Sequence, residues 1–205
     1  MKTAVLLLGL VLAACPDRPA ALPPVIDAGV PAAPRVPVQA KPTPEWDADF
    51  FTVDVVAMVV RLRHVEVVSV GPVKDEDILP GLDAGTIPDT TRTVFSDGTS
   101  YTVVLHKVAK RPYIASLDLK GGLSVEQADE NLDGHRDSVT ESDNSGREVK
   151  WRASRPGGHF DTLVTQAVLS RDGDYLMYQV TRWKDPDGDG QWTFEKTFKM
   201  SNISH

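Results

Sequence analysis

A strict alternation of apolar and polar residues constrains the fold of this chain more than any other feature of its sequence. In the segment 148–153, Val149, Trp151 and Ala153 alternate with charged residues, and the segment 192–200 shows a similar two-residue period. Such a period places one face of a strand against a core and the other face in water. These segments therefore predict half-buried strands of an antiparallel sheet.

Short turns separate most of the other segments that favour strands. Ser96-Asp97-Gly98 and the segment 171–174 carry the Asp and Gly residues that tight hairpin turns favour. The expected strands lie within residues 53–70, 93–95, 101–108, 113–119, 148–153, 160–169, 175–183 and 192–200. Roughly seven or eight strands joined by such turns predict a mainly β fold. We expect an antiparallel meander that forms a curved sheet, a sandwich or a small barrel.

At most one or two short helices are expected. A helix could begin at 43–45 and run through Trp46 and Phe50, and Ser124-Val125-Glu126-Gln127 has the spacing of a capping box that starts a helix. The segment 53–70 holds nine valines. Because β-branched residues lose rotamer freedom in a helix and pack well on a sheet, this segment predicts a strand.

The amino terminus has the pattern of an export signal. Lys2 follows Met1, residues 4–14 are apolar, and Cys15, the one cysteine of the chain, comes directly after them. This apolar segment is too short to span a bilayer. The arrangement resembles the signal of bacterial lipoproteins, in which the cysteine becomes the lipid-modified first residue. The resemblance implies that residues 1–14 are a signal peptide and that Cys15 carries long acyl chains such as palmitate. It also implies anchorage in a bacterial envelope membrane, facing the periplasm or the cell surface.

The segment that follows Cys15 predicts a tether. It holds nine prolines up to Pro44, and prolines this dense favour an extended chain of about 3.1 Å per residue. A proline-rich ligand for a recognition domain is the alternative. The remaining residues, about 160, are enough for one hydrophobic core. The expected organisation is a signal peptide at 1–14, the lipidated cysteine and Pro/Ala-rich tether at 15–44, and a single β-rich domain at 45–205.

The mature chain is acidic. Removal of the signal takes away Lys2 and changes the formal net charge from −7 to −8. A charge of this sign argues against nucleic acid and anionic lipid as partners. Because the lipid would occupy Cys15, no thiol remains for a disulfide, and the core, alone or with a metal ion, must hold the domain.

An acidic loop at 129–137 has the spacing of a calcium loop. Its candidate ligands are the side chains of Asp129, Asn131, Asp133 and Asp137 and the backbone carbonyl of His135. Oxygen side chains at loop positions 1, 3, 5 and 9, with Gly134 at position 6, match the alternate ligands that Ca²⁺ takes in a tight loop. The loop resembles those of EF-hand, dockerin and thrombospondin-type calcium modules, although position 12 is Thr140 instead of an acidic residue.

A second acidic loop begins at Asp185. Its candidate ligands are the side chains of Asp185, Asp187, Asp189 and Glu195 and the backbone carbonyl of Gln191. Gly190 again stands at position 6, but Glu195 is at position 11 instead of 12. In this one loop the chain resembles the calcium hairpins of integrin-type propeller repeats. Both resemblances imply calcium as a structural cofactor. The alternative is that both loops are ordinary solvated turns, since Asp, Asn and Gly form turns on their own.

The sequence contains no evident catalytic constellation. Its five histidines are scattered, without the spacing of a metal site, and neither a nucleophile elbow nor a phosphate-binding glycine loop is present. Trp183 and Trp192 bracket the second acidic loop. These two side chains could pack in the core. Alternatively, they could form an aromatic platform for a ligand, as in carbohydrate-binding β-domains.

These features together predict a lipid-anchored envelope β-domain that acts as a non-enzymatic binding or assembly protein. We expect attachment to the membrane through the lipid, and a protein, glycan or lipid of the envelope as partner, with no nucleic acid. Two other functions stay open. A meander that closes into a barrel would suit a carrier of an apolar ligand. Ser, His and Asp side chains that meet in space would instead make a hydrolase, so enzymatic activity is not decided by the sequence.

Overall fold

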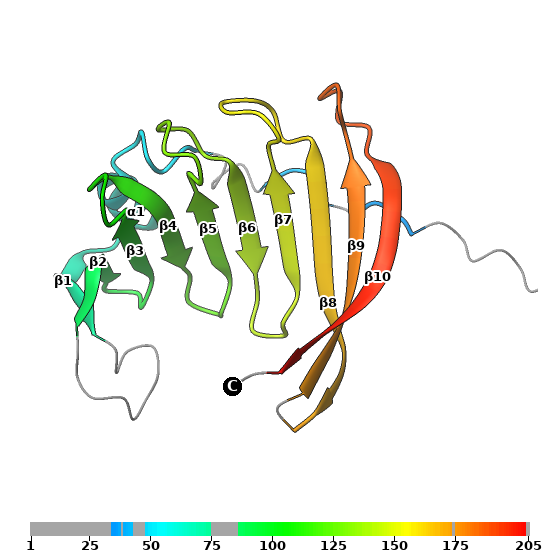
Figure 1. Cartoon of the computed structure of the whole chain (residues 1–205). Coiled ribbons are helices and arrows are strands. Elements are labelled where there is room, and N and C mark those ends of the chain that lie inside the picture. The colour runs from blue at the N-terminus through cyan, green and yellow to red at the C-terminus, as the bar shows by residue number, and fades with distance from the viewer. Residues whose placement is uncertain (1–33, 38, 43–47, 75–85, 174, 204–205) are drawn as a thin grey trace, which may run out of the picture. The chain divides into compact units, whose positions relative to one another are not determined.

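The computed structural model describes residues 34–37, 39–42, 48–74, 86–173 and 175–203. All of them belong to one compact unit, 33–205. Within these residues, ten strands form a single antiparallel sheet in which each strand pairs with the next one along the chain, so that β1 and β10 lie at the two edges (Figure 1). The strands are β1 (Val67–Lys74), β2 (Thr86–Phe95), β3 (Ser100–Leu105), β4 (Pro112–Asp118), β5 (Ser124–Ala128), β6 (Ser138–Ser142), β7 (Glu148–Arg152), β8 (Thr162–Asp172), β9 (Tyr175–Lys184) and β10 (Thr193–Ile203). The predicted antiparallel meander is confirmed, and it takes the form of an open sheet.

One face of this sheet carries the hydrophobic core. Trp151 pairs with Leu163, which in turn pairs with Trp183, and all three side chains are buried. Residues at alternate positions of β3 to β6 extend this buried surface across the sheet: Tyr101, Ala115, Leu117, Val125 and Val139. We call this side the core face and the opposite side the outer face. The alternation predicted for β7 therefore has its expected consequence, because every second side chain of β7 lies in the core.

A short helix covers part of the core face, and it lies where the sequence predicted a strand. α1 (Val55–Arg63) begins at Asp54, whose carboxylate accepts a hydrogen bond from the Ala57 amide at 3.0 Å. Val55 and Val59, one turn apart, are both buried against the sheet. The strand prediction for 53–70 is thus wrong for its first half. The N-cap and the burial of one helix face outweigh the modest preference of valine for strands.

The helix predicted from the capping-box spacing at Ser124 does not form. This segment is β5, and the Ser124 hydroxyl donates to Asp118 Oδ1 at 2.7 Å instead of capping a helix. Val125 and Gln127 are fully buried on the core face, whereas Glu126 points to the outer face. The neighbouring strand β6 was not expected either, because Val139 is its one apolar side chain. Pairing with β5 and β7 determines its conformation.

The segment before α1 crosses the core face. We call its described residues, 34–37, 39–42 and 48–50, the strap. The buried Gln127 side chain holds it twice, since Gln127 Oε1 accepts from the Phe50 amide at 2.8 Å and Nε2 donates to the Ala48 carbonyl at 2.5 Å. Farther along, Trp151 Nε1 donates to the Ala40 carbonyl at 3.2 Å. Part of the predicted tether therefore lies against the sheet. Among the described residues, no helix is long and apolar enough to cross a bilayer.

Candidate functional site

Three connecting loops lie next to one another at the same end of the strands. They are the β5–β6 loop (129–137), the β7–β8 loop (153–161) and the β9–β10 loop (185–192), which lie side by side at the top of Figure 1. Backbone hydrogen bonds continue the sheet between them: the Ala153 amide donates to the Asp137 carbonyl at 2.8 Å, and the Asp185 amide donates to the Asp161 carbonyl at 3.0 Å. Both acidic loops of the sequence thus belong to one contiguous surface.

The β5–β6 loop folds around its own acidic side chains. Asp129 is almost fully buried, and its carboxylate accepts hydrogen bonds from the amides of Asp133 and Gly134 at 3.1 and 2.8 Å. The Asp137 carboxylate accepts from the backbone and side-chain nitrogens of Asn131, both at 3.1 Å. Gly134 has a φ of 94°, a conformation that favours glycine. Hydrogen bonds within the loop thus hold Asp129 and Asp137 in place, but among the described residues Asp129, Asp133 and Asp137 do not lie close enough to one another to form a cluster of three carboxylates.

The β9–β10 loop has the tighter acidic cluster. Carboxylate oxygens of Asp185, Asp187 and Asp189 all lie within 4.8 Å of one another, a separation at which one cation can contact all three. The buried Asp185 accepts from the Gly188 and Gly190 amides at 3.0 and 2.9 Å, while Asp187 and Asp189 are exposed. Within the described residues, this is the one set of three metal-ligating acidic or imidazole groups so close together.

Two predicted ligands of the second loop have other contacts. The Gln191 amide donates from its backbone to Asp189 Oδ1 at 2.7 Å, and its side chain donates to Asp189 Oδ2 at 2.9 Å. Gln191 thereby orients Asp189. Glu195 lies on β10, with its carboxylate 3.8 Å from Arg182 Nε, and it is not part of the cluster of three aspartates.

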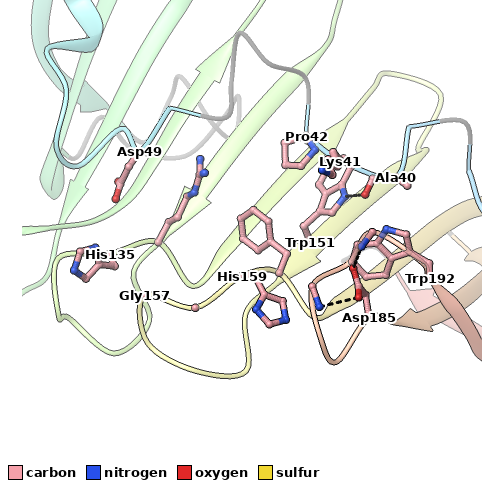
Figure 2. Close-up of a pocket in the computed structure, with 15 residues that line it drawn as sticks. Ala40, Lys41, Pro42, Asp49, His135, Trp151, Gly157, His159, Asp185 and Trp192 are labelled. Carbon is pink, nitrogen blue, oxygen red and sulfur yellow. Dashed lines mark hydrogen bonds between the residues drawn. The ribbon is translucent and has the colours of Figure 1, made fainter.

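A pocket of about 450 Å³ lies between the loops and the strap (Figure 2). Its side chains combine aromatic rings with charged and imidazole groups: Trp151, Phe160, Trp192, Lys41, Asp49, Arg136, His135, His159 and Asp185. Figure 2 shows Asp49 and His135 at one end and Asp185 and Trp192 at the other. Asp185, the buried member of the acidic cluster, lines the pocket together with Gly188 and Gly190 of the same loop.

The loops around this pocket hold one another in place. The His135 ring lies 3.6 Å from the point where a Cβ on Gly157 would be, and the His159 ring lies 2.8 Å from the corresponding point on Gly188. Each imidazole therefore packs on a glycine of the next loop. The closer contact leaves no room for a side chain at position 188 unless the His159 ring moves.

Arg136 connects the strap to the loops. Its Nη1 donates to the Ala48 carbonyl at 3.2 Å, and its guanidinium carbon lies 5.3 Å from the centre of the Phe160 ring. A guanidinium at this distance from an aromatic ring makes a favourable cation–π contact. Contacts within the chain thus position both the cation and the ring that line this part of the pocket.

The β7–β8 loop is closed by Asp161. Its carboxylate accepts hydrogen bonds from the Ser154 amide and hydroxyl at 3.2 and 2.9 Å and from the Thr162 hydroxyl at 2.9 Å. Burial alone would raise the pKa of Asp161, but the hydrogen bonds from Ser154 and Thr162 outweigh it and lower the pKa below its ordinary value. Asp161 therefore acts as an ionised anchor of this loop.

The described residues do not contain a catalytic pairing of a histidine ring with a serine or aspartate side chain. His135 and His159 pack on glycines, and His106 Nδ1 accepts from the Ala109 amide at 3.1 Å within a turn. The two tryptophans that the sequence left open have different roles. Trp183 is buried in the core, whereas Trp192 lines the pocket.

The sequence predicted the two acidic loops but not the pocket between the loops and the strap. Lys41 and Pro42 of the strap, in the segment predicted as a tether, form part of its wall. The weak signal was the repeated Gly-His pair of two loops, Gly134-His135 and Gly158-His159. No family model, no curated protein and no solved structure matches this chain, so its function must be inferred from the geometry of this site.

Proposed function

We propose that this chain is a lipid-anchored protein of the bacterial envelope that binds a glycan without transforming it. The observation that carries the proposal is the pocket of about 450 Å³ beside the β9–β10 loop, a volume typical of small-ligand sites. The export signal and Cys15 support the location. The proposed orientation is toward the periplasm or the cell surface, with the lipid in the membrane.

The chemistry of the pocket favours a saccharide unit over an apolar ligand. Trp192 and Phe160 offer aromatic surface on which the CH face of a sugar ring can stack, while Lys41, Asp49 and His159 offer donors and acceptors for hydroxyl groups. An apolar carrier needs an enclosed apolar interior. In the described part of the chain the sheet ends at β1 and β10 without closing on itself. The open sheet therefore favours binding of a ligand in the pocket between the three loops and the strap.

Binding to envelope glycan tests the proposal. The lipidated protein, purified in detergent, is mixed with insoluble peptidoglycan and separately titrated with chitotriose and maltotriose in a calorimeter. We expect one of these glycans to bind, and Trp192→Ala to weaken binding at least tenfold, because stacking surface is lost. Phe198→Ala removes an exposed aromatic ring on β10 outside the pocket and serves as the matched control. Equal binding by the wild type and Trp192→Ala, or turnover of any glycan, would contradict the proposal.

We further propose that the two acidic loops hold calcium as a structural cofactor. The cluster of Asp185, Asp187 and Asp189 supports this for the β9–β10 loop, since three carboxylates so close together repel one another unless a cation lies between them. Asp129 and Asp137 are the corresponding buried acids of the β5–β6 loop. A calcium ion in either loop would stabilise the wall of the glycan pocket.

The lipid anchor is tested independently of the ligand. Mass spectrometry of the native protein should find a chain that begins at Cys15 and carries acyl groups. An intact Met1 or an unmodified Cys15 thiol would refute the proposed anchorage.

A further inference from the structure

The strap is proline-rich and meets the sheet with a three-residue period. Its described residues between 34 and 40 belong to no helix or strand. Pro34, Pro37 and Ala40 are half-buried, whereas the two residues between the prolines are exposed. Because a polyproline helix has three residues per turn, residues three apart lie on one side of such a chain. The strap therefore has the exposure pattern of a proline-rich segment that lies with one side on a surface.

Two buried tryptophans of the core face lie in one row of the sheet beside this part of the strap. Trp151 pairs with Leu163, which pairs with Trp183, so the two tryptophans are two strands apart. Trp183 lines a groove of about 280 Å³ together with Pro34 and Pro37. We call the sheet side of this contact the strap groove, and it consists of Trp151, Thr165, Ala167, Gln179, Thr181 and Trp183.

One of the two indoles binds the backbone of the strap. Trp151 Nε1 donates to the Ala40 carbonyl at 3.2 Å. A proline-rich chain has few N–H groups but keeps all its carbonyl acceptors, so a surface that binds it needs apolar rings and hydrogen-bond donors. Aromatic-lined grooves that bind proline-rich segments combine these two features. The strap thus lies on the sheet in the manner of a bound proline-rich peptide.

The other indole has no partner. Trp183 is almost fully buried, and its Nε1 makes no hydrogen bond within the part of the chain that the structure describes. A buried donor without an acceptor is costly. Two strand spacings amount to about 10 Å, and three residues of a polyproline helix advance about 9 Å. Two carbonyls three residues apart in an extended chain can therefore meet both indoles, whereas the strap satisfies Trp151 alone.

We propose that the strap groove is a recognition site for an extended proline-rich segment of another protein, and that the strap occupies this site in cis. The seated strap identifies the chemistry of the occupant, because its half-buried prolines and its Ala40 carbonyl make the contacts. The strap is an incomplete match, since Trp183 Nε1 stays unpaired. A segment whose carbonyls meet both indoles can therefore displace it. Neither the glycan pocket nor the lipid anchor enters this inference.

Peptide binding to the full mature chain tests the proposal. The chain carries Cys15→Ser and therefore no lipid, and fluorescence anisotropy follows three labelled peptides. One has the sequence of residues 34–42, the second has the same sequence with alanine in place of each proline, and the third is an oligoproline. Because the tethered strap competes at an effective concentration of the order of millimolar, the wild type should bind all of them weakly.

Weakening the strap should open the groove to the added peptide. Pro37→Asp removes a half-buried ring of the strap, and this variant should bind the 34–42 peptide at least about tenfold more tightly than the wild type. Val36→Asp introduces the same charge at the neighbouring exposed position and is the matched control. Its affinity for the peptide should equal that of the wild type.

Variants of the groove, made in the Pro37→Asp chain, locate the binding site. Ala167→Lys places a long charged side chain in the groove, whereas Ser170→Lys places one on the same strand outside it, and both positions are exposed. The first should lower the affinity for the peptide at least about tenfold, and the second should leave it unchanged. Circular dichroism melting curves show that each variant is folded.

Replacing each indole by a phenyl ring separates the two donors. Trp151→Phe should weaken the 34–42 peptide and the oligoproline several-fold, because the donor to the Ala40 carbonyl is lost. Trp183→Phe should weaken the oligoproline several-fold but leave the 34–42 peptide unchanged, since Trp183 has no partner in the strap among the described residues.

Three results would overturn the proposal. One is that the Pro37→Asp chain binds neither the 34–42 peptide nor the oligoproline. Another is that the peptide without prolines binds as tightly as the 34–42 peptide, or that Ala167→Lys and Ser170→Lys have equal effects. The third is a dimer in sedimentation velocity without peptide binding, which would mean that the groove takes the strap of a second copy instead.

Discussion

A single buried amide fastens the strap to the sheet. Gln127 has no exposed surface, and its two polar atoms bond the backbone of Phe50 and Ala48. This residue was assigned to a helix on sequence grounds, because nothing in its neighbours reveals that the chain of residues 48–50 would return to it. The contact is a property of the tertiary structure alone.

Replacing Gln127 by Leu tests how strongly this contact stabilises the fold. The Phe50 amide and the Ala48 carbonyl would each lose their hydrogen bond with the Gln127 side chain, whereas Arg136 Nη1 would still donate to the Ala48 carbonyl. We expect the free energy of unfolding in urea to fall by about 1–3 kcal/mol. Gln179→Leu, at an exposed position of β9, should change it by less than about 0.5 kcal/mol. Equal stability of the two variants would show that the strap is not held by Gln127.

Asp161 makes the stability of the site depend on pH in a defined direction. The pKa of its carboxyl is lowered from the ordinary value of 3.8 in the folded protein. The contribution of ionised Asp161 to the free energy of unfolding is therefore complete at pH values above that ordinary pKa. It is lost as the pH falls through the lowered pKa of the folded protein. Urea unfolding between pH 6 and pH 2 should show a steeper acid loss in the wild type than in Asp161→Asn. Parallel curves would contradict the assigned role of the Ser154 and Thr162 hydrogen bonds.

Among the helices and strands, the prediction was correct where the local sequence pattern was strong. β7 and β9 were expected where they occur, because their alternation and their flanking turns agree. β6 was missed and α1 was assigned as a strand, because a polar strand and a valine-rich helix contradict the usual preferences of their residues. In both elements tertiary contacts decide the conformation, and for α1 the local signal was the Asp54 N-cap.

The interlocking of the loops is tested by adding one methyl group. Gly188→Ala and Gly190→Ala each place a side chain at positive φ, 74° and 85°, but a Cβ at 188 also meets the His159 ring, whereas position 190 is open. We expect both variants to lose about 1 kcal/mol of stability from backbone strain, and Gly188→Ala to lose more. Combining Gly188→Ala with His159→Ala should remove this additional loss of stability, because the clash with the His159 ring is then absent. Equal losses at the two glycines would mean that the His159 contact is unimportant.

The proposed binding of calcium in the acidic loops predicts a change in melting temperature. Millimolar calcium should raise the melting temperature of the wild type and a chelator should lower it, because an ion that binds the folded state alone stabilises that state. The double variant Asp133→Ala with Asp187→Ala should lose this response. Asp172→Ala, an exposed aspartate at the end of β8, should retain it. A melting temperature that is unaffected by calcium would identify both loops as ordinary turns.

For the whole molecule, the strap completes a core that an open sheet cannot bury by itself. Pro42 is buried, and Ala40 accepts the Trp151 indole hydrogen bond. We compare a chain that begins after Pro42 with one that begins at Pro34. The free energy of unfolding of the shorter chain should be lower by at least about 2 kcal/mol, because apolar surface around Trp151 becomes exposed. Its tryptophan emission should also shift to the red. Identical unfolding of the two chains would show that the strap is dispensable.

Local sequence patterns specify the mainly β meander, the positions of most strands and turns, and the two acidic loops. These properties depend on residues close together in the chain, whose alternation and turn chemistry act locally. Tertiary structure alone decided that the sheet stays open, that the strap and α1 cover its core face, and that the three loops enclose one pocket. Such features depend on contacts between distant segments, and no local pattern in the chain records which segments will meet.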